Sequence, residues 1–179
     1  MSSYPDDLLA QAEQLLRLDK GKPKQASLRR AVSTAYYALF HFLIEEATRQ
    51  MVGPARSNQE LRLLVGRGFT HTAMKQACNA FIQTNTNQIS ELLRPFWVRY
   101  SILSCAPVRS VADAFVTLQE ERHRADYNLA RPFTPEEAEG AIKRARAAML
   151  EWEALKTTQP ELARFYALSL YSWNLWKSR

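Results

Sequence analysis

The segment from Gln25 to Met51 limits the fold more than any other part of the chain. Its apolar residues recur every three or four positions, and no glycine or proline interrupts it before Gly53 and Pro54. This spacing gathers the apolar side chains on one face of an α-helix, whereas a half-buried strand needs strict alternation. The apolar positions are Leu28, Val32, Ala35, Tyr36, Leu39, Leu43 and Ala47. The pattern predicts one long helix.

The other segments predict further helices and no strand. Only five glycines are present, which leaves few residues for the tight turns of an all-β fold. The segment 89–105 is apolar but contains Pro95, so a helix, a kink and irregular backbone all remain open there. The predicted helices span residues 6–18, 25–51, 57–65, 71–81, 108–127, 134–155 and 160–177.

Two of these helices begin with a capping pattern. Thr134 is followed by Pro135 and, three residues after the threonine, by Glu137. This arrangement predicts Thr134 as N-cap, Pro135 as first helical residue and Glu137 as the acid that bonds back to the cap. Ser57 and Glu60 have the same spacing, so they predict a second capping box.

Long helices with short connections predict an all-α fold, namely an antiparallel helical bundle with additional N- and C-terminal helices. At 179 residues the chain is long enough for one sizeable core and short for two full domains. We therefore expect a single domain over residues 1–179. The aromatic helix at 160–177 is expected to pack on the bundle, although a dimer interface or a membrane surface would also suit it.

Several classes of protein are disfavoured by what the sequence lacks. Cys78 and Cys105 are far apart and form no CxxC pair, and the three histidines show no HxxxH or ExxH spacing, so we expect neither a disulfide framework nor a metal site. No glycine-rich phosphate motif or GxSxG occurs, and no cofactor is expected. The start lacks the pattern of a secretory signal, and the apolar stretch 165–176 is too short to cross a membrane. We expect a cytoplasmic protein.

Polar side chains follow two of the predicted helices beside their apolar faces. The first line is Arg30, Ser33, Tyr37 and His41, and the second is Gln119, Arg122, His123 and Asp126. If the lines meet, Asp126 would hold the guanidinium of Arg122, which keeps other donors for Tyr37 or for a bound phosphate. One interpretation is a buried polar network that fixes helix register. The other is a phosphate-binding cleft with His41 or His71 as proton carrier.

The charge balance favours an anionic partner such as RNA or DNA, because the net charge is +6. The densest run of basic residues is Arg17, Lys20, Lys22, Lys24, Arg29 and Arg30, and it would suit a phosphate backbone. The alternative interpretation of this run is a solvated junction between two helices. Arg67 and His71 are candidates because they precede or begin a predicted helix, where backbone amides attract anions. The candidate RNA- or nucleotide-binding residues are Lys22, Lys24, Arg30, Arg67, His71, Arg122, His123 and Arg124.

The stretches LRRAVSTAYYALFHFLIEEA at 28–47 and LQEERHRADYNL at 118–129 resemble the HEPN superfamily of small α-helical bundles. Within it the chain is most similar to bacterial proteins with an S-x-AYYA-x-FH helix and a late RHxADY segment. The resemblance covers roughly residues 25–150. It implies a bundle of four or five core helices, frequent homodimers, and roles in toxin–antitoxin or phage-defence systems. Some members bind nucleotides or partner a nucleotidyltransferase, and many are metal-independent ribonucleases.

The family's nuclease motif, an arginine and a histidine separated by four to six residues, is absent. At that spacing after Arg122 stand Tyr127, Asn128 and Leu129, and none of the three histidines follows an arginine at this distance. The usual imidazole proton carrier is therefore missing, and a phenol that titrates near pH 10 is a poor substitute.

Three functions remain open from the sequence. The first is a HEPN-like bundle that binds RNA or a nucleotide without catalysis, in a toxin–antitoxin or phage-defence setting. The second is a metal-independent ribonuclease with a rearranged centre, whose candidate catalytic residues are Arg122, Asp126, Tyr37 and His41. The third is a structural protein–protein interaction module whose basic charge is incidental.

Overall fold

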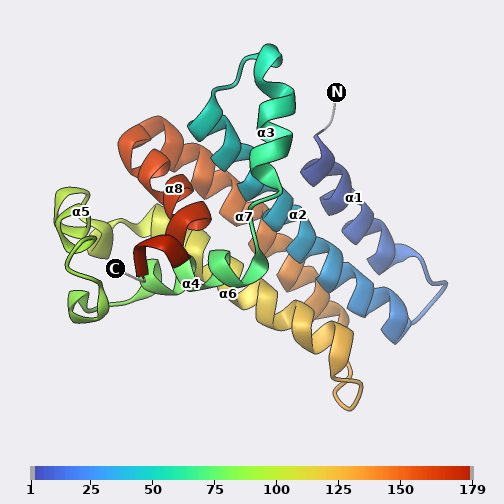
Figure 1. Cartoon of the computed structure of the whole chain (residues 1–179). Helices are drawn as coiled ribbons and strands as arrows, with labels where there is room; N and C mark the ends of the chain where they lie inside the picture. Colours follow the sequence, from blue (N-terminus) through green and yellow to red (C-terminus); the bar gives the residue numbers. More distant parts are fainter. Residues whose placement is uncertain (1–2, 178–179) are drawn as a thin grey trace. The chain divides into compact units, whose positions relative to one another are not determined.

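A computed structural model describes residues 3–177 of the chain, and the regular structure of this part is helical, with no strand (Figure 1). The all-α prediction is confirmed for these residues. None of the helices within them is long and apolar enough to span a membrane. The elements are α1 (Tyr4–Arg17), α2 (Gln25–Val52), η1 (Arg56–Asn58), α3 (Gln59–Gly66), α4 (His71–Ile82), η2 (Thr86–Gln88), α5 (Arg94–Arg99), η3 (Ile102–Ser104), α6 (Ala106–Tyr127), α7 (Pro135–Thr158) and α8 (Pro160–Lys177).

The chain divides into two compact units. The first comprises Met1–Phe42 and Ala114–Met149, and the second comprises Leu43–Asp113 and Leu150–Arg179. Helices α2, α6 and α7 each contribute residues to both units. The single-domain organisation stays a prediction, and the two units are described separately below.

In the first unit, α2 and α6 run antiparallel. Ser33 bonds to Asp126 and Tyr37 bonds to Arg122, so residue numbers rise along one helix as they fall along the other. The side chain of Tyr36 is buried in the same interface, with its ring centroid 5.7 Å from that of Phe115. The two helices thus pack as an antiparallel pair, although several other helices separate them in the chain.

The start of α7 is built as the sequence predicts. The backbone N–H of Glu137 donates to Thr134 Oγ1 at 3.2 Å, and the backbone N–H of Thr134 donates to Glu137 Oε2 at 2.9 Å. Pro135 is the first residue of the helix, where its missing N–H costs no hydrogen bond. The capping box at this position is confirmed.

The capping box predicted at Ser57 and Glu60 is wrong. Residues 56–58 form a turn of 3₁₀-helix, and α3 begins after Asn58, whose side chain makes no cap bond to that helix. The amide of Asn58 instead donates to the carbonyl of Val52 at 2.8 Å. Gly53 follows Val52 with a φ of 96°, the left-handed conformation that ends many helices. This segment therefore closes α2 before it starts α3.

Aromatic side chains form the core of the second unit. The ring of Phe81 lies 4.6 Å from that of Tyr166 and 4.8 Å from that of Trp97, and Tyr166 also packs on Trp152 at 5.8 Å. All four side chains are almost completely buried. Since Tyr166 belongs to α8, the aromatic C-terminal helix packs against the other helices of the second unit.

The segment that the sequence left open resolves into short helices. Pro95 lies in the first turn of α5, where proline is tolerated, and 3₁₀ turns flank this helix on either side. Pro95 therefore lies at the start of a helix and does not kink one. The two cysteines, Cys78 and Cys105, are buried and free.

Candidate functional site

The two polar lines meet in the first unit through Ser33, Tyr37, Arg122 and Asp126, which together with Tyr127 we call the Arg122 cluster. Asp126 Oδ1 accepts a hydrogen bond from Ser33 Oγ at 2.7 Å, and Asp126 Oδ2 lies 2.7 Å from Arg122 Nε. The second contact is an ion pair whose N–H is poorly aligned. Arg122 Nη2 donates to the hydroxyl of Tyr37 at 3.0 Å. The expected contact between Arg122, Asp126 and Tyr37 is therefore present.

The cluster is partly exposed. The side chains of Arg122 and Asp126 retain 24% and 21% of their accessible surface. Burial alone would lower the pKa of Arg122, but the neighbouring Tyr37 and Asp126 outweigh this effect and raise it. The guanidinium therefore stays charged, with one edge held by the protein and the remainder close to solvent.

Aromatic rings flank this guanidinium. Its central carbon lies 5.6 Å from the ring centroid of Tyr37 and 5.8 Å from that of Tyr127. The imidazole of His123 lies 4.9 Å from the Tyr127 ring, and both of these side chains are exposed. Sequence reasoning weighed Tyr127 only as a proton carrier and missed this stacking. The signal was its spacing of four residues from His123 on one helix.

His41 reaches the Arg122 cluster through Tyr37. The two rings are stacked with centroids 6.4 Å apart, and the ring of Tyr4 meets His41 edge-on at 5.1 Å. Burial lowers the pKa of His41, which favours the neutral form of its imidazole. A neutral imidazole can accept a proton.

Three of the candidate basic residues are exposed at the beginning of α2 and the turn before it. Lys22 and Arg30 make no ion pair with any residue in the range 3–177, and Lys24 has only a long contact of 3.6 Å with Asp19. Their charges are available to a phosphate backbone.

Arg29, which the sequence placed in the same basic run, has a different role. Its guanidinium donates to the carbonyl of Ala125, in the last turn of α6, at 2.9 Å and to that of Arg131, in the following loop, at 2.7 Å. It also lies 5.6 Å from the ring centroid of Phe133, and the guanidinium of Arg124 lies 5.8 Å from the same ring. Arg29 is thus a structural residue, and the basic run is smaller than expected.

Arg67 and His71 belong to the second unit. His71 is the first residue of α4, as predicted, but the side chain that caps the helix is that of Thr70, whose Oγ1 accepts from the N–H of Ala73 at 3.2 Å. Arg67 is exposed. These two residues and the Arg122 cluster lie in different units, and we assign them no common site.

Sequence reasoning missed a polar site in the second unit. Glu46 is buried on α2, with 3% of its side chain exposed, and it binds Arg49, Trp152 and Lys156. The signal was a carboxylate three residues after Leu43, within the apolar face of the helix.

Across residues 3–177, no group of three or more His, Cys, Asp or Glu side chains is placed to hold a metal ion. Comparison of the chain with protein-family models, with curated proteins and with solved structures finds no match.

Proposed function

We propose that this chain is a HEPN-like bundle that binds RNA or a nucleotide without cleaving it, as a component of a toxin–antitoxin or phage-defence system. The observation that carries the proposal is the exposed pair of His123 and Tyr127 beside the charged guanidinium of Arg122. Proteins that bind single-stranded nucleic acid stack bases on exposed aromatic rings and hold phosphates with nearby cations.

The chemistry of the cluster suits such a ligand. Tyr127 keeps 66% of its surface exposed, which leaves a ring face for a base. Arg122 is oriented by Asp126 and Tyr37, so little side-chain freedom is lost when it meets a phosphate. Lys22, Lys24 and Arg30 are exposed cations in the same unit, and they would add contacts to the phosphate backbone of an RNA strand.

The proposed cellular setting rests on the resemblance of residues 28–47 and 118–129 to the HEPN superfamily. It includes a homodimer and a partner nucleotidyltransferase. A nucleotidyltransferase gene beside the gene for this chain would support a paired toxin system.

Binding to a pool of single-stranded RNA tests the proposal. We expect log K to fall linearly with log salt, with a slope of about 0.7 for each phosphate contacted. Tyr127→Ala should weaken binding about fivefold or more, since stacking of one base is worth about 1 kcal/mol or more. Fluorescence anisotropy over a salt series measures both quantities.

The matched control is Leu150→Ala, which removes an equally exposed apolar side chain in the other unit and should leave affinity unchanged. A flat salt dependence, or equal affinities of the two variants, would contradict the proposal. Absence of binding would favour a protein–protein interaction module.

A ribonuclease with a rearranged centre is a second candidate, favoured by one observation. The ring of His41 stacks on that of Tyr37, whose hydroxyl accepts a hydrogen bond from Arg122, and burial lowers the pKa of His41. In this function His41 would take the proton of a ribose 2′-hydroxyl, and Arg122 would stabilise the charge that develops on phosphate. Asp126 would hold Arg122 in place.

If the chain is a nuclease, metal-free protein should cleave the RNA pool, and His41→Ala and Arg122→Ala should each slow cleavage at least tenfold. His71→Ala, in the other unit, should keep the original rate. Gel analysis of end-labelled RNA measures the rates. Cleavage that survives both substitutions would come from a contaminant and would remove this candidate.

A further inference from the structure

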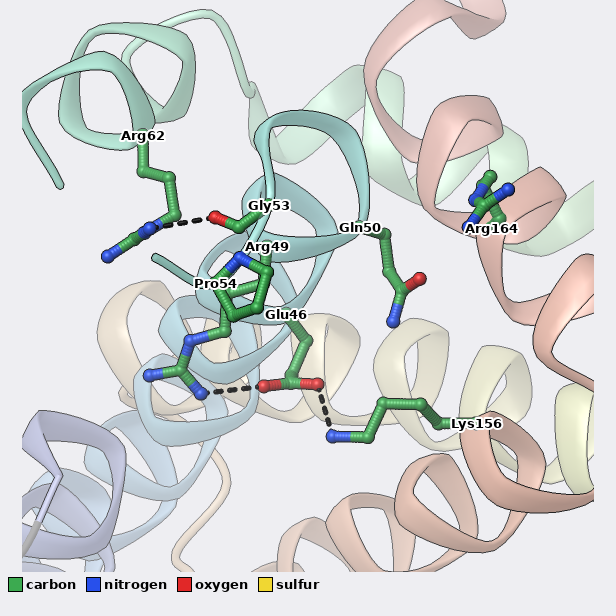
Figure 2. A pocket seen from close by; sticks show the side chains of 8 residues that line it. All are labelled: Glu46, Arg49, Gln50, Gly53, Pro54, Arg62, Lys156 and Arg164. Carbon is green, nitrogen blue, oxygen red and sulfur yellow. Dashed lines mark hydrogen bonds and ion pairs between the residues drawn. The ribbon is translucent and has the colours of Figure 1, made fainter. Parts of the chain in front are cut away.

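The second unit contains a pocket of about 570 Å³ that none of the functions above uses (Figure 2). Its volume lies in the range typical of sites for small organic ligands. It is lined by Glu46, Arg49, Gln50, Gly53, Pro54, Arg62, Lys156 and Arg164. These residues come from the end of α2 and the turn after it, from α3, from the end of α7 and from α8.

Four of the lining side chains are cations, and one is a carboxylate. Figure 2 shows that carboxylate, Glu46, between Arg49 and Lys156. Glu46 Oε1 accepts from Arg49 Nη1 at 2.8 Å, and Oε2 accepts from Lys156 Nζ at 2.7 Å and from Trp152 Nε1 at 3.0 Å. Both oxygens are thus occupied within the protein. Glu46 positions two cations at the pocket and leaves it with an excess of positive charge.

The other two cations, Arg62 and Arg164, complete the lining. Arg62 Nη1 donates to the carbonyls of Gly53 and Ala55 at 2.8 Å, which leaves its Nε and Nη2 for other acceptors. The bonds of Arg62 to Gly53 and of Asn58 to Val52 also cover carbonyls at the end of α2 that would repel an anion. Arg164 has only a distant contact of 4.0 Å with Glu161.

Carboxylates outside the pocket compete weakly for these cations. Glu153 contacts Lys156 at 2.8 Å, and Glu45 lies 3.6 Å from Arg49. Glu153 and Glu161 keep 51% and 66% of their side-chain surface exposed. Exposed ion pairs of this kind are screened by water and contribute little. A ligand that carries more negative charge than a carboxylate can therefore displace them.

We propose that this pocket binds a small molecule through a terminal phosphate group. A phosphate monoester carries between one and two negative charges at pH 7 and offers three acceptor oxygens, so it suits a pocket lined by several cations better than a single carboxylate does. The guanidinium of Arg164 can present a fork of N–H groups to phosphate oxygens, and Arg49 and Arg62 keep the N–H groups that their bonds through Nη1 do not use. Gln50 is placed to bond to the remainder of the molecule. The pocket shares no residue with the Arg122 cluster, so the proposal is independent of RNA binding there.

Isothermal titration of the full chain with three probes tests the proposal. Adenosine 5′-monophosphate and inorganic phosphate should bind and compete with each other, whereas adenosine should not bind. Tighter binding of the nucleotide than of phosphate would identify a phosphate ester as ligand class, and equal binding would identify free phosphate. Adenosine binding as tight as that of its monophosphate would overturn the proposal.

Variants of Arg164 test whether the phosphate probes bind in the pocket. This exposed side chain contributes little to the fold, so its replacement should change binding without unfolding the protein. Arg164→Ala should weaken phosphate binding at least fivefold, Arg164→Glu should weaken it further, and Arg164→Lys should restore part of it. Arg94→Ala is the matched control, since Arg94 is exposed in the same unit but does not line the pocket, and it should change affinity less than twofold. Unchanged affinity in Arg164→Glu, or no binding of either phosphate probe by the original chain, would overturn the proposal.

Discussion

Replacing Glu46 by alanine is expected to lower the free energy of unfolding by about 3–5 kcal/mol, the usual cost of removing one partner of a buried ion pair. The carboxylate is almost completely buried and accepts hydrogen bonds from Arg49, Trp152 and Lys156. Its removal leaves the indole N–H of the fully buried Trp152 without an acceptor and the ammonium of Lys156 without its inner partner. Urea denaturation followed by tryptophan fluorescence measures the loss.

Glu153→Ala is the matched control, because Glu153 contacts the same ammonium of Lys156 at 2.8 Å but has half of its side chain exposed. It should cost less than about 1 kcal/mol. If Glu46→Ala and Glu153→Ala lower the free energy of unfolding equally, burial of the Glu46 carboxylate has no energetic consequence, and the prediction is wrong.

The pH dependence of stability gives an independent check on Glu46. Burial alone would raise the pKa of this carboxyl, but the hydrogen bonds from Lys156 and Trp152, with the charge of Lys156, outweigh burial and hold the pKa below 4.5. A carboxyl whose pKa is lower in the folded state stabilises the fold above its unfolded pKa and loses this contribution as pH falls through the folded value. The stability difference between the original chain and Glu46→Gln should therefore shrink as pH falls below about 4.5.

Helices could be predicted from the sequence wherever a local pattern decides the structure. The apolar spacing of residues 25–51 predicts α2 to within one residue of its observed end, and Thr134 and Glu137 predict the start of α7. The failure at Ser57 has a tertiary cause. The spacing to Glu60 is correct for a cap, but Asn58 is used to close the preceding helix, and a local pattern cannot reveal this competition.

Part of the candidate site could also be predicted, because it too depends on a local pattern. Arg122 and Asp126 are four residues apart on one helix, so their ion pair follows from local geometry, and the polar line on α2 supplied Tyr37 as a partner. Glu46 and its partners could not be joined in this way. Trp152 and Lys156 lie 106 and 110 residues away from it in the chain, and only the packed structure brings them together.

Replacing Asp126 by alanine is expected to lower the free energy of unfolding by about 2–3 kcal/mol, because charge-assisted hydrogen bonds contribute more than neutral ones. The substitution removes the acceptor of the Ser33 hydroxyl and the carboxylate that neutralises Arg122. Since Asp126 keeps 21% of its side chain exposed and Glu46 only 3%, water offsets more of the loss at Asp126, and the effect is smaller than that at Glu46. Asp126→Asn keeps an acceptor for Ser33 and should cost less.

The same substitution separates the two interpretations of the Arg122 cluster, because stability and binding respond in opposite directions. In Asp126→Ala the guanidinium of Arg122 loses its neutralising partner, so its attraction for phosphate increases while the fold weakens. We therefore expect a lower melting temperature together with equal or tighter RNA binding at low salt. Asp113→Ala, an exposed carboxylate on the same helix, should change neither property. An unchanged melting temperature would contradict a structural role for Asp126, and a loss of RNA affinity in protein that remains folded would show that its orientation of Arg122 matters more for binding than the charge that it neutralises.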